Sequence, residues 1–177
     1  VNRPQQEEEF TAGNVGFTAT LLEKLKQRDN PCPVMLSSSI QAERDNPYGR
    51  SKRAGEELVF AYSKETGAPV YVYRFPNVFG KWCRPNYNSA IATFCHNIAR
   101  NLPIQVNDPS VVLNLVYIDD LVAELIRALQ HNPTKSGDYC AVPVVHTMTL
   151  GEIVALLYDF KACREQLRVP DLSDPFT

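Results

Sequence analysis

The 177-residue sequence has no excess of positive charge, no long apolar run and no cysteine spacing typical of a metal site. Lys and Arg number 18 and Asp and Glu number 20, so the formal net charge of −2 argues against nucleic acid as the main partner. No apolar run reaches the roughly 18 residues needed to span a membrane, and no signal peptide is recognisable. These absences favour a cytoplasmic protein that acts away from membranes and nucleic acids.

Cysteine and histidine are few and scattered. The five cysteines form no CxxC pair, and the three histidines lie far apart in the sequence. This pattern predicts free thiols in a reducing compartment and no metal centre. Cys95 and His96 are adjacent on one predicted helix, where we expect them to pack in the core rather than bind a ligand.

The first half of the chain alternates helical and β-rich stretches, and 44% of all residues are hydrophobic, enough for a globular core. The apolar spacing predicts helices over 18–27 and 47–66 and strands over 33–39 and 68–74. This order is typical of a parallel sheet with helices on its faces. We therefore predict an α/β fold, in which ligands bind beyond the carboxyl ends of the strands.

More elements are predicted after a polar and aromatic loop at 75–82. They are helices over 88–101, 121–130 and 153–163, and strands over 104–106, 111–118 and 139–142. Thr149 and Glu152 have the spacing of a capping box before the last helix. Residues 169–177 are expected to form a linker or a frayed end.

Three hydroxyls, a phenol and an ammonium group are the strongest candidates for chemistry. Ser37–Ser39 end an apolar run, a pattern that fits a buried strand opening into a site. Tyr48 and Lys52 lie four residues apart on the predicted helix, so they share one face. Such a pair alone is typical of a solvated surface, but the upstream serines favour a catalytic role. The Lys ammonium should lower the pKa of the phenol, which then exchanges a proton with a carbonyl or alcohol.

Four stretches occur in a fixed order and together cover most of the chain. They are Asn14–Thr18, Ser37–Ser39 with Tyr48–Lys52, Arg74–Gly80, and Val116–Leu121. In this order they resemble the extended short-chain dehydrogenases/reductases that act on nucleotide sugars. The resemblance implies a Rossmann-like parallel sheet with flanking helices, without its first strands, plus a small α/β substrate-binding region.

The resemblance also implies roles for particular residues. Tyr48 would be the general acid that protonates the reduced carbonyl oxygen, and Lys52 would bind the nicotinamide ribose. Ser39 would be the catalytic hydroxyl, with Ser38 as the second candidate. Cofactor contacts would come from Val1, Asn2, Arg3, Ser37, Ser38, Tyr48, Lys52, Pro76 and Val78. Substrate contacts would come from Ser39, Asn77, Lys81, Arg84 and Asn88.

Two features depart from the family pattern. The glycine-rich turn that holds the cofactor pyrophosphate at a helix N-terminus is absent from this sequence. We therefore expect the chain to be a piece that starts in the middle of a domain and is inactive alone. Many relatives also place an Arg before the Tyr-Val-Asp-Asp segment, whereas this chain has Val112–Leu115. Diphosphate binding would then depend on residues such as Asn77, Lys81, Arg84 or Asn88.

The implied domain organisation has two main parts. Residues 1–80 would complete the dinucleotide-binding domain, and 81–168 would mainly bind substrate, with 116–143 returning to the first sheet. The tail at 169–177 would be a linker. Within the family, Val1–Pro4, the short loop between the serines and Tyr48, and Lys81–Asn88 resemble bacterial reductases of capsular polysaccharide synthesis. That subgroup implies a homodimer and a C-terminal cupin domain in the parent protein.

The function implied is reduction of a UDP-linked 4-keto-deoxy-amino sugar by NADPH, with NAD(H) as the other cofactor option. A 4-epimerase or dehydratase of the same family is the first alternative, and a truncated, non-catalytic binding domain is the second. Two single residues stay open. Trp82 either stacks on a base or sugar or anchors its loop half-buried, and Asn14 either polarises the helix through a water or caps it.

Overall fold

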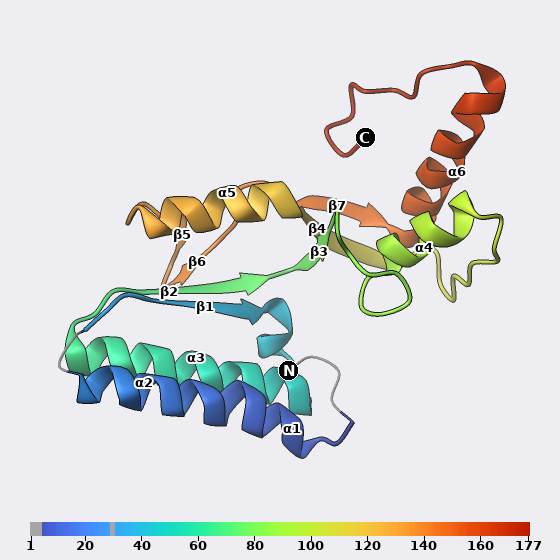
Figure 1. Ribbon diagram of the computed structural model, residues 1–177. Coiled ribbons are helices and arrows are strands. Elements are labelled where there is room, and N and C mark those ends of the chain that lie inside the picture. The colour runs from blue at the N-terminus through green and yellow to red at the C-terminus, as the bar shows by residue number, and fades with distance from the viewer. Residues whose placement is uncertain (1–4, 29–30) are drawn as a thin grey trace. The chain divides into compact units, whose positions relative to one another are not determined.

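The computed structural model describes residues 5–28 and 31–177, which form two compact units. Unit 1 comprises the chain up to residue 76 together with 124–142, and unit 2 comprises 77–123 and 143–177. Both units combine strands with helices, and the chain is an α/β protein with parallel strands and flanking helices, as predicted (Figure 1).

The sheet of unit 1 has the strand order β1-β2-β6-β5. Strand β1 (Val34–Ser39) runs parallel to β2 (Val70–Phe75), and β2 runs parallel to β6 (Tyr139–Cys140). The short β5 (Lys135–Ser136) pairs antiparallel with β6. Because Ser39 lies opposite Phe75, the carboxyl ends of β1 and β2 reach the same edge of the sheet. That edge is where a parallel sheet binds its ligands.

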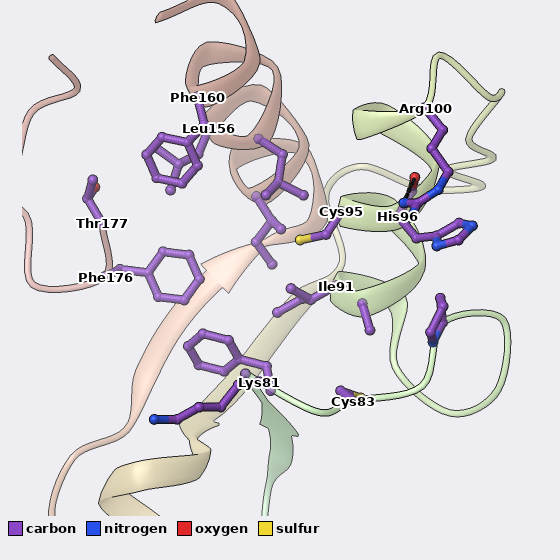
Figure 2. A pocket seen from close by; sticks show the side chains of 16 residues that line it. Lys81, Cys83, Ile91, Cys95, His96, Arg100, Leu156, Phe160, Phe176 and Thr177 are labelled. Carbon is purple, nitrogen blue, oxygen red and sulfur yellow. Dashed lines mark hydrogen bonds between the residues drawn. The ribbon is translucent and has the colours of Figure 1, made fainter. Parts of the chain in front are cut away.

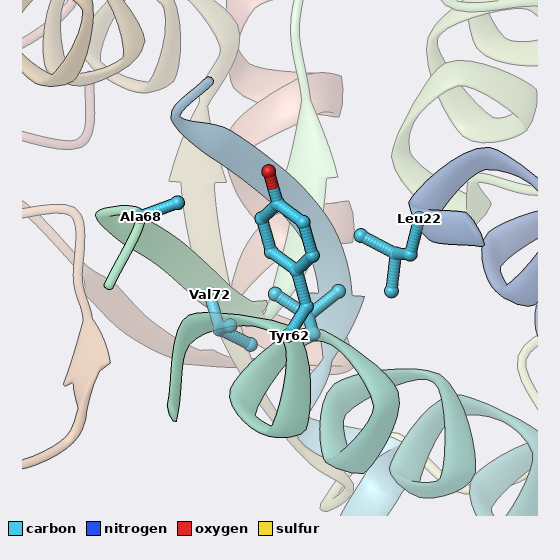
Figure 3. Close-up of a cluster of buried hydrophobic side chains, with 5 residues drawn as sticks. Leu22, Tyr62, Ala68 and Val72 are labelled. Carbon is cyan, nitrogen blue, oxygen red and sulfur yellow. The ribbon is translucent and has the colours of Figure 1, made fainter. Parts of the chain in front are cut away.

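Helices α2 (Phe17–Gln27) and α3 (Pro47–Thr66) lie side by side against this sheet (Figure 1). The core between these helices and the sheet consists of buried apolar side chains (Figure 3), namely Leu22, Val59, Tyr62, Ala68 and Val72. Burying one large apolar side chain stabilises a fold by about 1.5–3 kcal/mol. Helix α3 begins at an Asn46 cap and ends at Gly67, whose φ of 74° suits glycine.

Three short elements adjoin these helices. Helix α1 (Glu8–Phe10) continues into the π-helix η1 (Thr11–Gly16), and the 3₁₀ helix η2 (Ile40–Glu43) follows β1. The boundary between the two units falls within helix α5 (Ile118–Leu129). The second half of α5 belongs to unit 1 and carries Glu124. The buried carboxylate of Glu124 accepts a hydrogen bond from the Tyr73 hydroxyl of β2 at 2.8 Å.

Unit 2 has a three-stranded sheet in the order β3-β4-β7. Strand β3 (Asn77–Phe79) runs parallel to β4 (Val112–Tyr117), and β4 runs antiparallel to β7 (His146–Thr149). Helices α4 (Ala90–Ala99) and α6 (Leu150–Gln166) pack against each other. The core of this unit is apolar and consists of Ile91, Leu115 and Ile153, with partly buried neighbours around them.

Most predicted elements are confirmed, and five local features differ from the expectations. Residues 104–106 form no strand, whereas β3 lies inside the stretch expected to be a loop. Strands β5 and β7 were not expected; both are too short to show a strand pattern. The expected capping box of Thr149 and Glu152 is present at the start of α6.

Cys95 is exposed, not packed in the core. Among the described residues, no helix combines the length and apolar character required to cross a membrane.

Candidate active site

The predicted serine, tyrosine and lysine lie together in unit 1. Ser39 is the last residue of β1 and caps η2, accepting a hydrogen bond from the backbone N of Gln41 at 3.2 Å. Tyr48 stands in the first turn of α3, and its phenol lies close enough to Ser39 for that side chain to lower the phenol pKa. The Lys52 Nζ lies 5.9 Å from the Tyr48 ring centroid and donates to the Ser37 carbonyl at 3.2 Å. The strand end and the helix start thus bring all three side chains to one place.

The environment of Tyr48 corrects one sequence-based expectation. Burial raises the pKa of the phenol, and the hydrogen bond with Ser39 lowers it by less, so the net shift is upward. The expected lowering by Lys52 is therefore wrong for this structure. The Phe10 ring, 5.5 Å from the Tyr48 ring, supplies part of this apolar cover. Tyr48 accordingly keeps its proton at neutral pH.

Lys52 is half-buried between its helix and β1. Burial lowers the pKa of its ammonium, and the negative charge of Glu56, one turn along α3, raises it. Lys52 also lines a cavity of about 240 Å³ formed by α2, α3 and β1. Polar neighbours in the cavity wall include Asn14 and Thr18, while most of the wall is apolar.

The start of α3 is fixed by two backbone contacts that only glycine permits. A Cβ at Gly49 would lie 2.3 Å from the Gln41 carbonyl oxygen and 2.4 Å from the Arg44 carbonyl oxygen. The Gly49 N–H donates to the Asn46 side chain at 2.8 Å. Helix α3 is therefore pressed against the loop after β1, which sets the position of Tyr48. Sequence reasoning did not single out Gly49; the available signal was a poor helix former in a first turn.

A second contact ties Tyr48 to the π-helix. The Asn14 side chain donates to the Ser51 hydroxyl at 3.0 Å, and that hydroxyl donates to the Tyr48 carbonyl at 2.8 Å. Asn14 lies inside η1 and makes no helix cap, so the capping interpretation is wrong. Isolated π-turns recur at functional sites. Ser51 was not among the sequence-based candidates.

The predicted substrate residues lie in unit 2. Asn77 and Val78 belong to β3, opposite Leu115 and Val116 of β4. The Lys81 Nζ forms an ion pair with Asp119 at 2.8 Å, and both side chains are about half exposed. Lys81 follows the carboxyl end of β3.

The loop after β3 has an unusual backbone. Positive φ angles occur at Gly80, Trp82 and Asn86, of which the last two are non-glycine residues. Trp82 is 95% exposed, so the half-buried anchor is wrong and stacking on a ligand stays a prediction. The Arg84 guanidinium lies 5.7 Å from the centroid of the Tyr87 ring. Strained loops of this kind concentrate at binding sites, which makes 80–88 a candidate ligand segment.

Unit 2 also contains a cavity of about 580 Å³ (Figure 2). Its walls are mainly apolar and come from β3, α4, α6 and the C-terminal segment, including Phe79, Ile91, Ile153, Leu156, Leu157, Phe160 and Phe176. Lys81 lines it as well. Figure 2 shows Ile91 and Cys95 extending from α4 toward α6. A pocket of this size accommodates a small organic ligand.

Other predicted site residues are not tested by the geometry. Val1, Asn2 and Arg3 lie outside the described residues. Pro76 closes unit 1 after β2, while Asn88 is exposed just before the Ser89 cap of α4. Among the described residues, no cluster of three or more His, Cys, Asp or Glu side chains forms a metal site.

The fold agrees with the comparisons to known proteins. A model of the NAD dependent epimerase/dehydratase family matches residues 2–141, and the chain belongs to this family. It is 46% identical over 167 residues to the UDP-2-acetamido-2,6-beta-L-arabino-hexul-4-ose reductase of Pseudomonas aeruginosa PA103. It is 29% identical over 149 residues to UDP-glucuronate 4-epimerase 1 of Arabidopsis thaliana.

Among solved structures, the capsular polysaccharide assembling protein CapF of Staphylococcus aureus resembles this chain with 52% identity and a TM-score of 0.87. The alignment covers 94% of this chain and 46% of CapF. The reductase alignment covers 94% of this chain and 45% of the relative, and the epimerase alignment covers 72% and 34%. The chain thus spans less than half the length of these relatives.

Proposed function

We propose that the protein is an NAD(P)H-dependent reductase of a UDP-linked 4-keto-deoxy-amino sugar, acting in bacterial capsule or surface polysaccharide synthesis. NADPH is the proposed cofactor and NAD(H) the alternative. The observation that carries the proposal is the cluster of Ser39, Tyr48 and Lys52 at the carboxyl end of β1. Its occurrence in a chain 46% identical to a hexulose reductase supports this substrate class.

Within this proposal each side chain of the cluster has one task. Ser39 donates a hydrogen bond to the sugar carbonyl oxygen, and Tyr48 delivers its proton to that oxygen as the carbon is reduced. Lys52 binds the ribose hydroxyls of the cofactor and stabilises negative charge that develops on the phenol. Ser38 is buried and hydrogen-bonded to Glu56, which supports Ser39 as the catalytic hydroxyl.

The residues present fit the reacting end of a nicotinamide dinucleotide. Lys52 offers an ammonium donor at the wall of the 240 Å³ cavity, and it lies beside Ser37, an exposed residue whose carbonyl accepts its hydrogen bond. When bound, the cofactor supplies the hydride. Pro76 and Val78, with Val1–Arg3 outside the described part, are proposed to border the dinucleotide.

Tyr48 is in the protonated form that a proton donor requires. Burial holds the pKa of the phenol above its usual value, so the group carries a proton throughout the neutral range. A reductase needs a proton donor at this step, whereas an epimerase must first remove a proton from a sugar hydroxyl. The protonated phenol is compatible with the donor role, and the cofactor stoichiometry described below decides between the two activities.

The UDP part of the substrate is proposed to lie along the loop after β3. Asn77, Lys81, Arg84 and Asn88 supply amide and cationic groups suited to a diphosphate. Lys81 already pairs with Asp119, so a phosphate would replace an exposed carboxylate partner at little cost. We also propose that the whole protein is a homodimer, which sedimentation analysis tests.

The decisive experiment compares wild type with Tyr48→Phe in the protein as it is naturally made. NADPH fluorescence reports cofactor binding, and NADPH oxidation with a UDP-4-keto sugar reports turnover. We expect Tyr48→Phe to bind NADPH and lose about 10²- to 10⁴-fold in kcat, the usual contribution of general acid catalysis. Tyr158→Phe is the control, because Tyr158 is 46% exposed on α6. Unchanged kcat in Tyr48→Phe would contradict the proposal.

A 4-epimerase or dehydratase is the second candidate, favoured by the match to UDP-glucuronate 4-epimerase 1. The two activities differ in cofactor stoichiometry. A reductase oxidises one NADPH for each sugar converted, whereas an epimerase returns its cofactor unchanged. Sugar conversion without net NADPH oxidation would establish an epimerase or dehydratase, which loss of water from the sugar then distinguishes. If neither binding nor conversion is observed, a non-catalytic binding domain is left.

A further inference from the structure

A buried carboxylate lies one helical turn from the lysine of the Ser-Tyr-Lys cluster. Glu56 lies on α3, one helical turn after Lys52, and is 1% exposed. Its carboxylate accepts hydrogen bonds from the Ser38 hydroxyl on β1 and from the Tyr139 hydroxyl on β6, the latter at 3.3 Å. It therefore joins the helix to two strands of the unit 1 sheet.

Arg74 on β2 completes this group. Its Nε donates to the two Glu56 oxygens at 3.0 and 3.1 Å, and its Nη2 donates to Oε2 at 2.6 Å. Nη2 also donates to the Tyr139 hydroxyl at 2.7 Å, and the guanidinium lies 4.1 Å from the centroid of that ring. Its Nη1 donates to Glu43 of η2 at 3.2 Å. One guanidinium thus connects four elements of the unit.

Ser38, which donates to Glu56, is the direct neighbour of two serines that contact the cluster. Ser38 lies between Ser37, whose carbonyl accepts a hydrogen bond from Lys52, and Ser39, whose side chain is near enough to Tyr48 to affect its pKa. Arg74 lies opposite Ser38 in the β1–β2 register. The ion pair consequently holds the strand that carries the serines against the helix that carries the phenol and the ammonium.

Stability alone does not account for a buried ion pair. Removing two charged groups from water costs free energy that their attraction only partly offsets, so well-packed apolar residues stabilise a core equally well. A fixed carboxylate next to a half-buried ammonium has a second effect, because it favours the charged form of that ammonium.

We propose that Glu56 and Arg74 are positioning residues for the catalytic cluster: their ion pair locks β1 against α3 and keeps a negative charge one turn from Lys52. The proposal rests on the proposed function for the identity of the cluster. It assigns a task to two residues that do not themselves touch substrate or cofactor.

The charge on Lys52 gives a readout that needs no substrate. The groups facing Glu56 are Arg74, Tyr139 and Ser38, with Glu43 beyond Arg74. Of the nearby groups, Glu56 is the one that raises the pKa of Lys52 against the effect of burial. Removing its charge must therefore lower the pKa of Lys52 and increase the fraction of neutral amine at a given pH.

The test measures acylation of Lys52 by acetic anhydride as a function of pH, with peptide mass spectrometry, in the protein as it is naturally made. In Glu56→Gln we expect the profile to move to lower pH and the rate near neutral pH to rise. Glu57→Gln is the matched control, because it removes an exposed carboxylate from the adjacent position of the same helix. Equal profiles in the two variants would overturn the proposal.

Should Glu56→Gln fail to fold, the double variant Glu56→Gln/Arg74→Met replaces it, since neither charge is then left buried without its partner. We expect a cooperatively melting protein in which the Lys52 profile still moves to lower pH, by a smaller amount. If the double variant has the wild-type pH profile of Lys52 acylation and the wild-type kcat, the ion pair has only a structural role and the proposal is overturned.

The turnover assay separates this inference from the proposed function. Where wild type reduces a UDP-4-keto sugar, we expect the double variant to lose at least about tenfold in kcat with little change in KM, because substrate contacts are intact. If wild type reduces no such sugar but Lys52 responds to Glu56→Gln, the reductase assignment fails and the positioning role stands. If reduction occurs and Lys52 does not respond, the positioning role fails alone.

Discussion

The two units bury different kinds of side chain. Among the described residues, all six buried polar or charged side chains belong to unit 1, namely Asn14, Thr18, Ser38, Ser51, Glu56 and Glu124. The core of unit 2 is built from aliphatic and aromatic groups, and its ion pairs, Lys81–Asp119 and Arg168–Asp159, join partly exposed side chains. Unit 1 therefore holds polar atoms in fixed positions, as proton transfer requires. Unit 2 instead contains a mainly apolar cavity whose lining includes the charged side chains of Lys81 and Arg100.

This difference predicts where each unit is sensitive. A buried polar group depends on its partner, because an unpaired charge in the interior is costly. An apolar core depends on volume, because a removed side chain leaves a cavity. Substitutions that remove charge should therefore damage unit 1, and substitutions that remove volume should damage unit 2.

Arg74→Met should produce the largest effect. It leaves the buried Glu56 carboxylate without its ion-pair partner, and breaking such a pair costs about 3–5 kcal/mol of unfolding free energy. Denaturant titration followed by circular dichroism measures the loss. The control is Arg50→Met, which breaks a pair with Asp45 exposed to solvent and should leave the midpoint unchanged within error. Equal losses in both variants would remove the distinction between buried and exposed charge.

Leu115→Ala should produce the next largest effect, now in unit 2. Leu115 is 1% exposed on β4, and a Leu→Ala change at a buried position costs about 2–5 kcal/mol. Val112→Ala on the same strand is the control, because Val112 is 58% exposed. The same denaturant titration applies. A loss at Leu115 no greater than at Val112 would mean that this unit has no volume-dependent core.

A smaller, pH-dependent effect is expected at Glu124. Burial raises the pKa of this carboxyl, but hydrogen bonds from the backbone N and hydroxyl of Thr134 (2.7 and 2.8 Å) and from Tyr73 (2.8 Å) outweigh it, so the pKa is lowered overall. The group therefore contributes stability above its unfolded pKa of about 4.3 and loses it as the pH falls through the lower folded value.

Thermal melts between pH 6 and pH 3 test this expectation. The melting temperature of wild type should fall on acidification more steeply than that of Glu124→Gln, because the variant lacks the titrating group. Glu57→Gln, which alters an exposed position, should follow wild type. Parallel curves for wild type and Glu124→Gln would show that the Thr134 and Tyr73 contacts do not stabilise the charged form.

Asp119→Asn should have the smallest effect on stability. Its ion pair with Lys81 is exposed, and such pairs are screened by solvent and salt. We expect a melting curve that coincides with wild type at low and at high salt. A clear destabilisation would mean that unit 2, too, depends on a specific charge pair, and the contrast between the units would be weaker than described.

Sequence patterns predicted the long elements and the proximity of Ser39, Tyr48 and Lys52 because both depend on local spacing; the catalytic role of the three residues stays a prediction. Tyr48 and Lys52 share a helix face by period alone, and the serines end a recognisable apolar run. The pKa direction of Tyr48 was wrong because it depends on burial beside Phe10, a contact made across the fold. Glu56 escaped notice because a glutamate on an amphipathic helix is normally solvated.

Other failures have the same origin. The stretch at 104–106 has strand composition, but nothing in unit 2 pairs with it, whereas β3 forms because β4 lies beside it. Short strands such as β5 exist through their partners rather than their own propensity. The tasks assigned to Asn77, Lys81, Arg84 and Asn88 stay predictions, since they concern a ligand and not the fold.

The tight approach at Gly49 has a genetic consequence. Every amino acid reached from a glycine codon by one base change carries a Cβ, and at this position that atom would collide with two carbonyl oxygens. No single-nucleotide missense change is therefore tolerated beside Tyr48, whereas Gly67 has open space around it and limits substitution only through its φ of 74°. In a saturation library selected for function, codon 49 should be depleted of all missense alleles and codon 67 only in part.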